Sequence, residues 1–237
     1  MSWFSRNRRP RRDEEIMFDD SFSRRVFISK VLMIVAINLV FTVLVMTFCI
    51  FHMGARRFLL RHWYIGLIAI AVNMTMSIMM CFCINLFRKS PSKYILLVIY
   101  VIAHAALVAC FAVRYHPKLV FIAVAVCSVI VILLGLFARF APCDFTGCCV
   151  FVFVLCLVVI IMGIFSLFFP ILRIVYVSLG VLLFSIFIVI DLQMIIGGKT
   201  HKNEFDQSDF ILAAMFLYSD IIFLFLYLLE LIGLVDS

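Results

Sequence analysis

The sequence predicts an all-α integral membrane protein, built as a bundle of seven hydrophobic helices. Of its 237 residues, 67% are hydrophobic and only 14% are charged, and the mean hydropathy is +1.25. Apolar runs of about 20 residues, the length that crosses a bilayer as a helix, recur along the chain. Their hydrophobicity is continuous rather than alternating, which excludes a transmembrane β-barrel. The composition also excludes an ordinary soluble domain.

The expected membrane segments use most of the chain, and no loop between them is long enough to form a soluble catalytic domain. We therefore expect no enzymatic activity and no bound cofactor. Residues 1–25 form a cytosolic, arginine-rich arm, and residues 26–237 form the membrane domain. Acidic residues within the arm favour contact with lipid headgroups over nucleic-acid binding. The seven segments are 26–51, 63–87, 94–113, 117–138, 148–169, 171–196 and 210–234.

The first three segments carry isolated polar residues. Asn38 lies in the first, and Asn73 and Ser77 lie in the second. Such groups commonly bond between membrane helices, at about 0.6 to 2 kcal/mol each. His104 lies at the centre of the third segment and is a secondary candidate for pH sensing. A neutral imidazole bonded to a neighbouring helix is the state that we favour for it.

The last four segments are separated by clear breaks. Pro117 opens the fourth segment and Pro170 follows the fifth. The sixth segment stops at Gly197-Gly198, and Ser208 or Asp209 can cap the seventh. The seventh segment either spans the membrane or is re-entrant, and the side on which the C-terminus lies depends on this choice.

The distribution of positive residues predicts a cytosolic N-terminus, because Lys and Arg near the ends of spans favour the cytoplasmic side. The arm and the second, fourth and sixth loops hold most of the 20 Lys and Arg residues. The opposite side holds only Arg56, Arg57, Arg61, Arg114, Lys118 and Arg173.

Asp191 and Asp220 are the main candidate site residues. Each lies inside an apolar segment, where an ionised carboxylate costs roughly 2.5–3.5 kcal/mol on insertion scales. Their neighbours one helical turn away are apolar, so any hydrogen-bond partner must come from another helix. The short connection between the two segments predicts antiparallel neighbours that could bring the carboxyl groups together. Because burial and like charge both disfavour ionisation, such a pair would tend to share a proton near neutral pH.

Four stretches carry a resemblance to a known family. They are SRRVFISKV (23–31), CDFTG (143–147), and the two long blocks at 174–199 and 210–233 that contain the aspartates. With them the chain resembles the transmembrane Bax-inhibitor-motif family, and most closely its lifeguard branch. The family's aspartate–threonine–glutamine motif reads Asp191-Leu192-Gln193 here, and Phe216 replaces a common asparagine. The arginine-rich arm also replaces the Pro- and Gly-rich tail of lifeguards.

The resemblance implies a pH-sensitive calcium leak of intracellular membranes with an anti-apoptotic effect. It assigns the ion path and the pH gate to Asp191 and Asp220, which would bind calcium only transiently. Some members are thought to pair the aspartates with an arginine, and Arg88 in FRKSP is the nearest match. The implied partners are the bilayer, calcium as the permeant ion and apoptosis-regulating membrane proteins, without nucleic acid. The endoplasmic reticulum, the Golgi and the plasma membrane all stay open as locations.

Other function classes make different predictions. A non-conducting interaction protein would restrain death signalling through partner binding and would not need the aspartates. A seven-helix receptor is disfavoured by the predicted cytosolic N-terminus and by the short loops. An intramembrane aspartate protease would carry a glycine-aspartate motif, which neither Asp191 nor Asp220 has.

Overall fold

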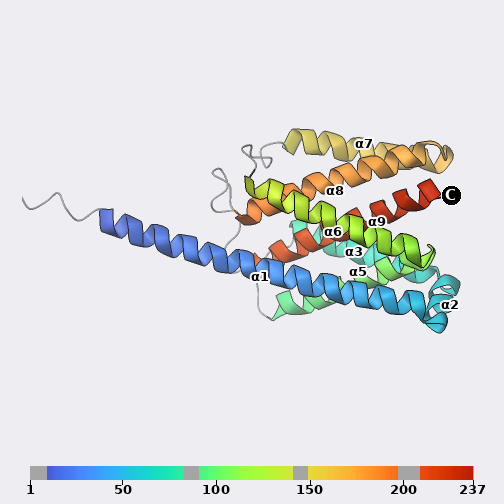
Figure 1. Cartoon of the computed structure of the whole chain (residues 1–237), viewed down its shortest axis with the longest axis horizontal. Coiled ribbons are helices and arrows are strands. Elements are labelled where there is room, and N and C mark those ends of the chain that lie inside the picture. The colour runs from blue at the N-terminus through green and yellow to red at the C-terminus, as the bar shows by residue number, and fades with distance from the viewer. Residues whose placement is uncertain (1–9, 83–90, 141–148, 197–208, 237) are drawn as a thin grey trace, which may run out of the picture.

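The chain folds into a bundle of long helices (Figure 1). The structure is a computed structural model that describes residues 10–82, 91–140, 149–196 and 209–236. No strand occurs within these ranges. The helices are α1 (Pro10–Phe51), α2 (Met53–Arg61), α3 (Tyr64–Phe82), α5 (Ser92–Ala112), α6 (Pro117–Phe140), α7 (Cys149–Phe168), α8 (Leu172–Ile196) and α9 (Phe210–Asp236).

These helices confirm the predicted all-α membrane bundle. In the described residues six helices are long and apolar enough to span a membrane, and α2 with α3 forms a seventh candidate that is bent by 77°. Large apolar side chains cover the outside of the bundle. Ile37, Leu44 and Phe151, for example, are 61%, 64% and 60% exposed. An apolar surface of this extent requires lipid around it.

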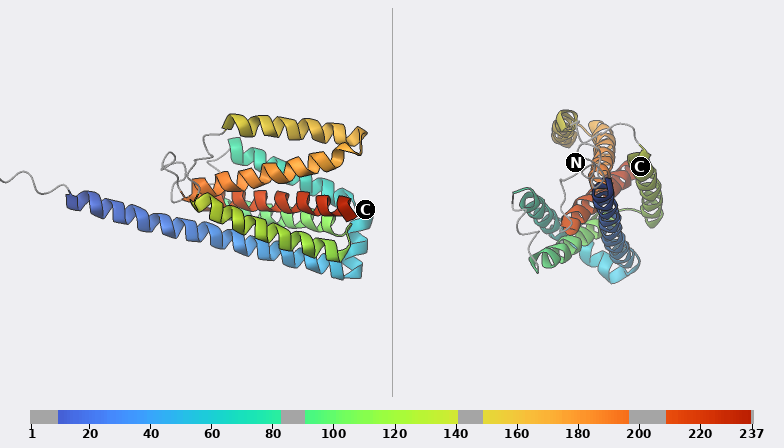
Figure 2. Two further views of the ribbon diagram at one scale, coloured as in Figure 1. Left: turned by 45° about the horizontal axis from the view of Figure 1, so that its top comes forward. Right: turned by 90° about the vertical axis from the view of Figure 1, so that its left-hand side faces the viewer.

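Helix α9 lies at the centre of the bundle and is the most buried of the candidate spans. It packs against α8, α1, α6 and α5, and its contact with α8 is the most extensive of all the helix pairs. Helix α3 packs on α5, and α7 packs chiefly on α8 at the periphery (Figures 1 and 2). The segment that carries Asp220 is therefore surrounded by four other spans.

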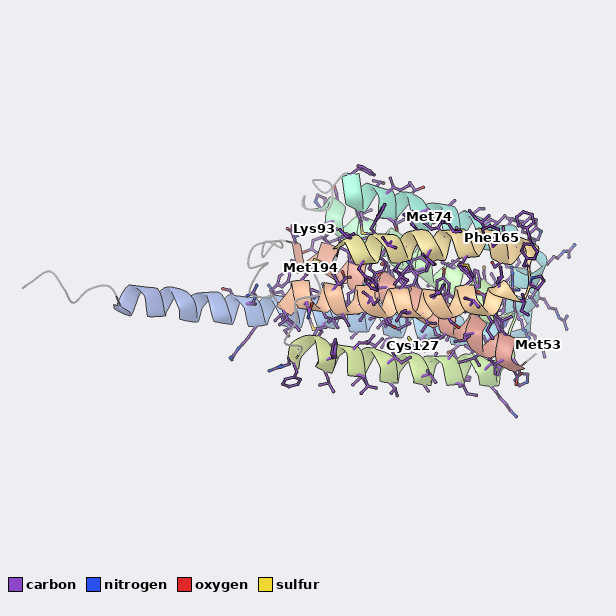
Figure 3. The ribbon with its side chains drawn as sticks, turned by 90° about the horizontal axis from the view of Figure 1, so that it is seen from above. Met53, Met74, Lys93, Cys127, Phe165 and Met194 are labelled. Atoms are coloured by element: carbon purple, nitrogen blue, oxygen red, sulfur yellow. The ribbon has the colours of Figure 1, made fainter. Side chains whose placement is uncertain are left out.

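Helix α9 also settles the form of the last segment. It is one continuous helix of 27 residues, or about 40 Å at 1.5 Å per residue, so it crosses the bundle rather than turning back. It runs antiparallel to α8, as the short connection predicted (Figure 1). Figure 3 places Lys93 and Met194 at the end of the bundle from which α1 projects, and Met53 at the opposite end.

Two helix boundaries differ from the sequence prediction. Helix α1 begins at Pro10 and continues without a break into the first span, so part of the predicted arm is helical. Proline is favoured in the first turn of a helix, where no backbone N–H is needed. The short amphipathic helix α2 precedes α3. Its Arg56 donates from Nε to the Val113 carbonyl at 3.3 Å and so joins α2 to the end of α5.

The end of the bundle near Lys93 is held by an aromatic ring between two cations. The Nζ atoms of Lys93 and Lys30 lie 4.9 and 5.7 Å from the ring centroid of Phe210. Lys93 is only 9% exposed, so its ammonium group is largely removed from solvent against this ring. The start of α9 is thereby fixed to both α5 and α1.

Candidate functional site

Asp191 of α8 and Asp220 of α9 form a pair inside the bundle, and their carboxyl groups lie close enough to interact directly. Both residues are half-buried, and Oδ2 of Asp191 is fully enclosed without a hydrogen-bond partner among the described residues. Asp191 lies one turn before Met194, so the pair is nearer the Lys93 end of the bundle. The sequence predicted this meeting from the short connection between the two helices.

The contact has a direct chemical consequence. A hydrogen bond between two carboxyl groups needs a proton on one of them, because two carboxylates have only acceptor atoms. The aspartate pair (Asp191 and Asp220) can therefore form such a bond only while it holds a proton. Loss of that proton would leave two like charges in contact, which repel by about 4 kcal/mol at 4 Å and an effective dielectric constant of 20.

An aromatic seam separates the aspartate pair from the end of the bundle where α8 begins and α9 ends. It consists of Tyr176, Phe184, Phe223 and Tyr227. Phe184 stacks on Phe223 and Tyr227 with centroid distances of 5.2 and 5.5 Å. The hydroxyl groups of Tyr176 and Tyr227 are hydrogen-bonded at 2.8 Å. Beyond the seam, Arg173 and Glu230 form an ion pair at 2.8 Å.

Gly180 allows α8 and α9 to approach closely at the seam. A Cβ atom at this position would lie 2.4 Å from Cδ1 and Cε1 of Tyr227 and 2.9 Å from its Cγ. No side chain fits against a ring at that distance. The glycine therefore fixes the spacing of the two helices that carry the aspartates.

His104 lies on α5 and is fully buried. Its ring centroid is 5.3 Å from that of Tyr218 and 5.8 Å from that of Phe223, so it lies at the height of Asp220 along α9. Its Nδ1 atom is 3.1 Å from the Tyr100 carbonyl, one turn earlier in the same helix. The expected bond to a neighbouring helix is therefore replaced by a bond within α5. Nε2 has no partner among the described residues.

Two further tyrosines extend the polar interior. Tyr100 and Tyr218 are both fully buried. The Tyr218 hydroxyl is 2.7 Å from Oγ1 of Thr42, which also donates to the Asn38 carbonyl at 2.8 Å. Sequence reasoning missed both tyrosines, because a tyrosine in an apolar run is an ordinary packing residue until its neighbours are known.

The remaining site predictions have simpler outcomes. Arg88 lies outside the described residues, so its place relative to the aspartate pair is not part of the structure. Among the described residues, no group of three or more His, Cys, Asp or Glu side chains gathers to hold a metal ion.

A cavity of about 270 Å³ lies elsewhere in the bundle, between α1, α5, α6 and α9. Its lining includes Met46, Val108, Cys127 and Ile221 and is almost wholly apolar. A calcium ion takes six to eight oxygen ligands, whereas Thr42 and Ser128 are the only lining residues with side-chain oxygens. The cavity is therefore distinct from the aspartate pair and is not a cation site.

Comparison with known proteins gives a consistent assignment. A family model described as "Inhibitor of apoptosis-promoting Bax1" matches residues 24–237. Protein lifeguard 3 of Homo sapiens is 28% identical over 223 residues, which cover 91% of this chain and 71% of that protein. Protein lifeguard 3 of Mus musculus is 28% identical over 222 residues, with the same shares covered.

Proposed function

From the premise that this chain belongs to the Bax inhibitor family, we propose that it is a pH-sensitive calcium leak channel whose gate is the aspartate pair. The observation that carries the proposal is the close approach of the Asp191 and Asp220 carboxyl groups across the α8–α9 contact. The pair closes the bundle while it shares a proton. Deprotonation creates the like-charge repulsion worked out above and loosens the two helices.

The same pair suits calcium as a passing ion. Calcium takes six to eight oxygen ligands, whereas two carboxylates offer at most four, so water must complete the shell. A site that binds weakly and incompletely favours release over storage, which conduction requires. No resident metal is needed in this mechanism, and calcium acts as the permeant ion.

The aromatic seam gives the closed state its barrier. Phe184 and Phe223 stack directly beyond the aspartate pair, and a hydrated ion cannot pass between rings in contact. Separation of α8 and α9 at the pair would part these rings as well, since one ring comes from each helix. The gate and the barrier are therefore coupled through the same interface.

The proposed setting is an intracellular membrane, in the endoplasmic reticulum or the Golgi, with the N-terminus in the cytosol. The aspartate pair then lies nearer the cytosolic face, since Lys93 and Met194 mark the end from which α1 projects (Figure 3). A rise in cytosolic pH would open the leak. Release of calcium through such a leak would lower the calcium content of the store. A full store can trigger cell death, so this release is the proposed link to apoptosis.

The test is calcium efflux from liposomes that contain the purified full chain, measured between about pH 6 and pH 8. We expect efflux that rises with pH for the wild type and loses its pH dependence in Asp220→Asn and Asp191→Asn. Glu230→Gln is the matched control, because it removes an acidic group from α9 at the far side of the aromatic seam. Equal pH profiles for the wild type and both aspartate variants would refute the gate.

An absence of efflux from folded wild-type protein would instead support a non-conducting interaction protein. In that case the arm becomes the part to test, because it is the charged segment outside the bundle. Deletion of residues 1–22 would then abolish the protective effect in cells, while Asp191→Asn would leave it intact.

A further inference from the structure

The interior of the bundle holds polar atoms that the described protein does not satisfy. They are Nδ2 of Asn38, both amide atoms of Asn73, the hydroxyl of Tyr100, Nε2 of His104 and Oδ2 of Asp191. Asn38, Asn73, Tyr100 and His104 are 8%, 3%, 0% and 0% exposed. Each buried polar group without a partner costs about 1–3 kcal/mol, and folded interiors avoid this cost almost everywhere. Unsatisfied groups from four different helices therefore need a shared explanation.

These groups are neighbours rather than scattered exceptions. The rings of Tyr100 and His104 are 4.3 Å apart, and both contact the ring of Tyr218. The Tyr218 hydroxyl meets Thr42, whose own hydroxyl donates to the carbonyl of Asn38. Helices α1, α5 and α9 thus share one polar region.

The packing of α3 on α5 brings Asn73 to the same region. The Tyr100 hydroxyl lies near Ser77 of α3 and Ser219 of α9, although neither contact meets the geometry of a hydrogen bond. Helices α3 and α5 run antiparallel. The residue one turn before Ser77 therefore faces the residue one turn after Tyr100. This register places Asn73 opposite His104.

The aspartate pair borders this region. The Tyr100 hydroxyl is close enough to Asp191 and Asp220 to interact electrostatically with both. We name Asn38, Asn73, Tyr100 and His104 the inner polar cluster.

The chemistry of the unsatisfied atoms identifies the ligand. Nδ1 of His104 donates to the Tyr100 carbonyl, which leaves Nε2 as an acceptor in the neutral ring. Asn73 offers an acceptor and a donor, whereas Nδ2 of Asn38 is a donor. A bare cation would satisfy the acceptors and leave the amide donors unpaired. Water pairs with both kinds of atom and typically makes about three hydrogen bonds in a protein interior.

We propose that bound water fills the inner polar cluster. The site is internal and hydrated, with His104 and Asn73 facing each other across α3 and α5. The proposal goes beyond the calcium leak and does not depend on it.

Radiolytic labelling by brief X-ray pulses tests this site, because hydroxyl radicals formed from bound water oxidise the side chains beside it. The full chain in lipid nanodiscs is exposed, and oxidation rates are read by mass spectrometry. Met46 is the internal reference. It is only 1% exposed and lies in the wall of the apolar cavity, and a thioether is intrinsically more reactive than a phenol.

We expect Tyr100 and His104 to be oxidised several-fold faster than Met46 despite their complete burial. Asn73→Leu should lower both rates several-fold, whereas Thr75→Val, a lipid-facing change on the same helix, should leave them unchanged. Rates for Tyr100 and His104 no higher than that of Met46 in wild-type protein would overturn the proposal. This comparison needs no variant, so it stands even where Asn73→Leu fails to fold.

Discussion

Substitution of Gly180 by alanine should weaken the packing of α8 against α9. The added Cβ would lie 2.4 Å from two ring atoms of Tyr227, about 1 Å short of the 3.4 Å at which ordinary contacts begin. The ring cannot swing away freely. Its hydroxyl is bonded to Tyr176, and its face is stacked on Phe184 at 5.5 Å. The whole ring and its partners must therefore move.

The size of the effect follows from opposing contributions. Overpacking costs about 1–3 kcal/mol, and loss of the Tyr176–Tyr227 hydrogen bond adds about 0.5–1.5 kcal/mol. Alanine returns up to about 1 kcal/mol through its better helix propensity. We expect net destabilisation of about 1–3 kcal/mol. At roughly 2–4 °C per kcal/mol for a chain of this size, the thermal midpoint should fall by several degrees.

The assay is thermal unfolding in detergent micelles, followed by intrinsic fluorescence and by size-exclusion chromatography. Gly135→Ala is the matched control, since the nearest atom to its new Cβ is Cδ1 of Leu192 at 3.9 Å. Tyr227→Leu in the Gly180→Ala background should recover part of the loss by giving the methyl group room. A Gly180→Ala midpoint at or above that of the wild type would refute the packing argument.

Three other changes test separate parts of the bundle by the same unfolding assay. Phe210→Leu removes the ring that faces Lys93 and should cost about 0.5–2 kcal/mol; an unchanged midpoint would contradict this role. Tyr218→Phe deletes the hydrogen bond to Thr42 and should cost about 0.6 kcal/mol. An unchanged midpoint would mean that the hydroxyl does not stabilise the bundle. Burial raises the pKa of Tyr115, which lies between two spans, above its usual range. Tyr115 therefore stabilises the fold fully below about pH 10 and less as the pH rises further. The thermal midpoint of Tyr115→Phe should then fall less at alkaline pH than that of the wild type.

The helical segments could be predicted because each apolar run is long enough to be recognised by itself. The exception, α2, is short, rich in arginine and shaped by its contact with the end of α5. The helical start of α1 was missed as well. Its residues are polar, and hydropathy says nothing about a helix that continues out of the membrane.

The candidate site also has one part that the sequence predicts and one part that it does not. The aspartate pair could be predicted, because carboxyl groups inside apolar helices are rare and the short connection forces the two helices together. The inner polar cluster could not be predicted. Asn73, Tyr100 and His104 are each unremarkable in sequence, and their meeting depends on how α3 and α9 both pack on α5.

The central position of α9 also has a consequence for biosynthesis. This helix leaves the ribosome after all of the spans that it holds together. Until it enters the bilayer, Thr42 of α1 lacks the hydroxyl of Tyr218, and Asp191 of α8 lacks the neighbouring carboxyl of Asp220. The earlier spans therefore lack their central partner until then, and we expect that retention by membrane chaperones ends only when α9 inserts.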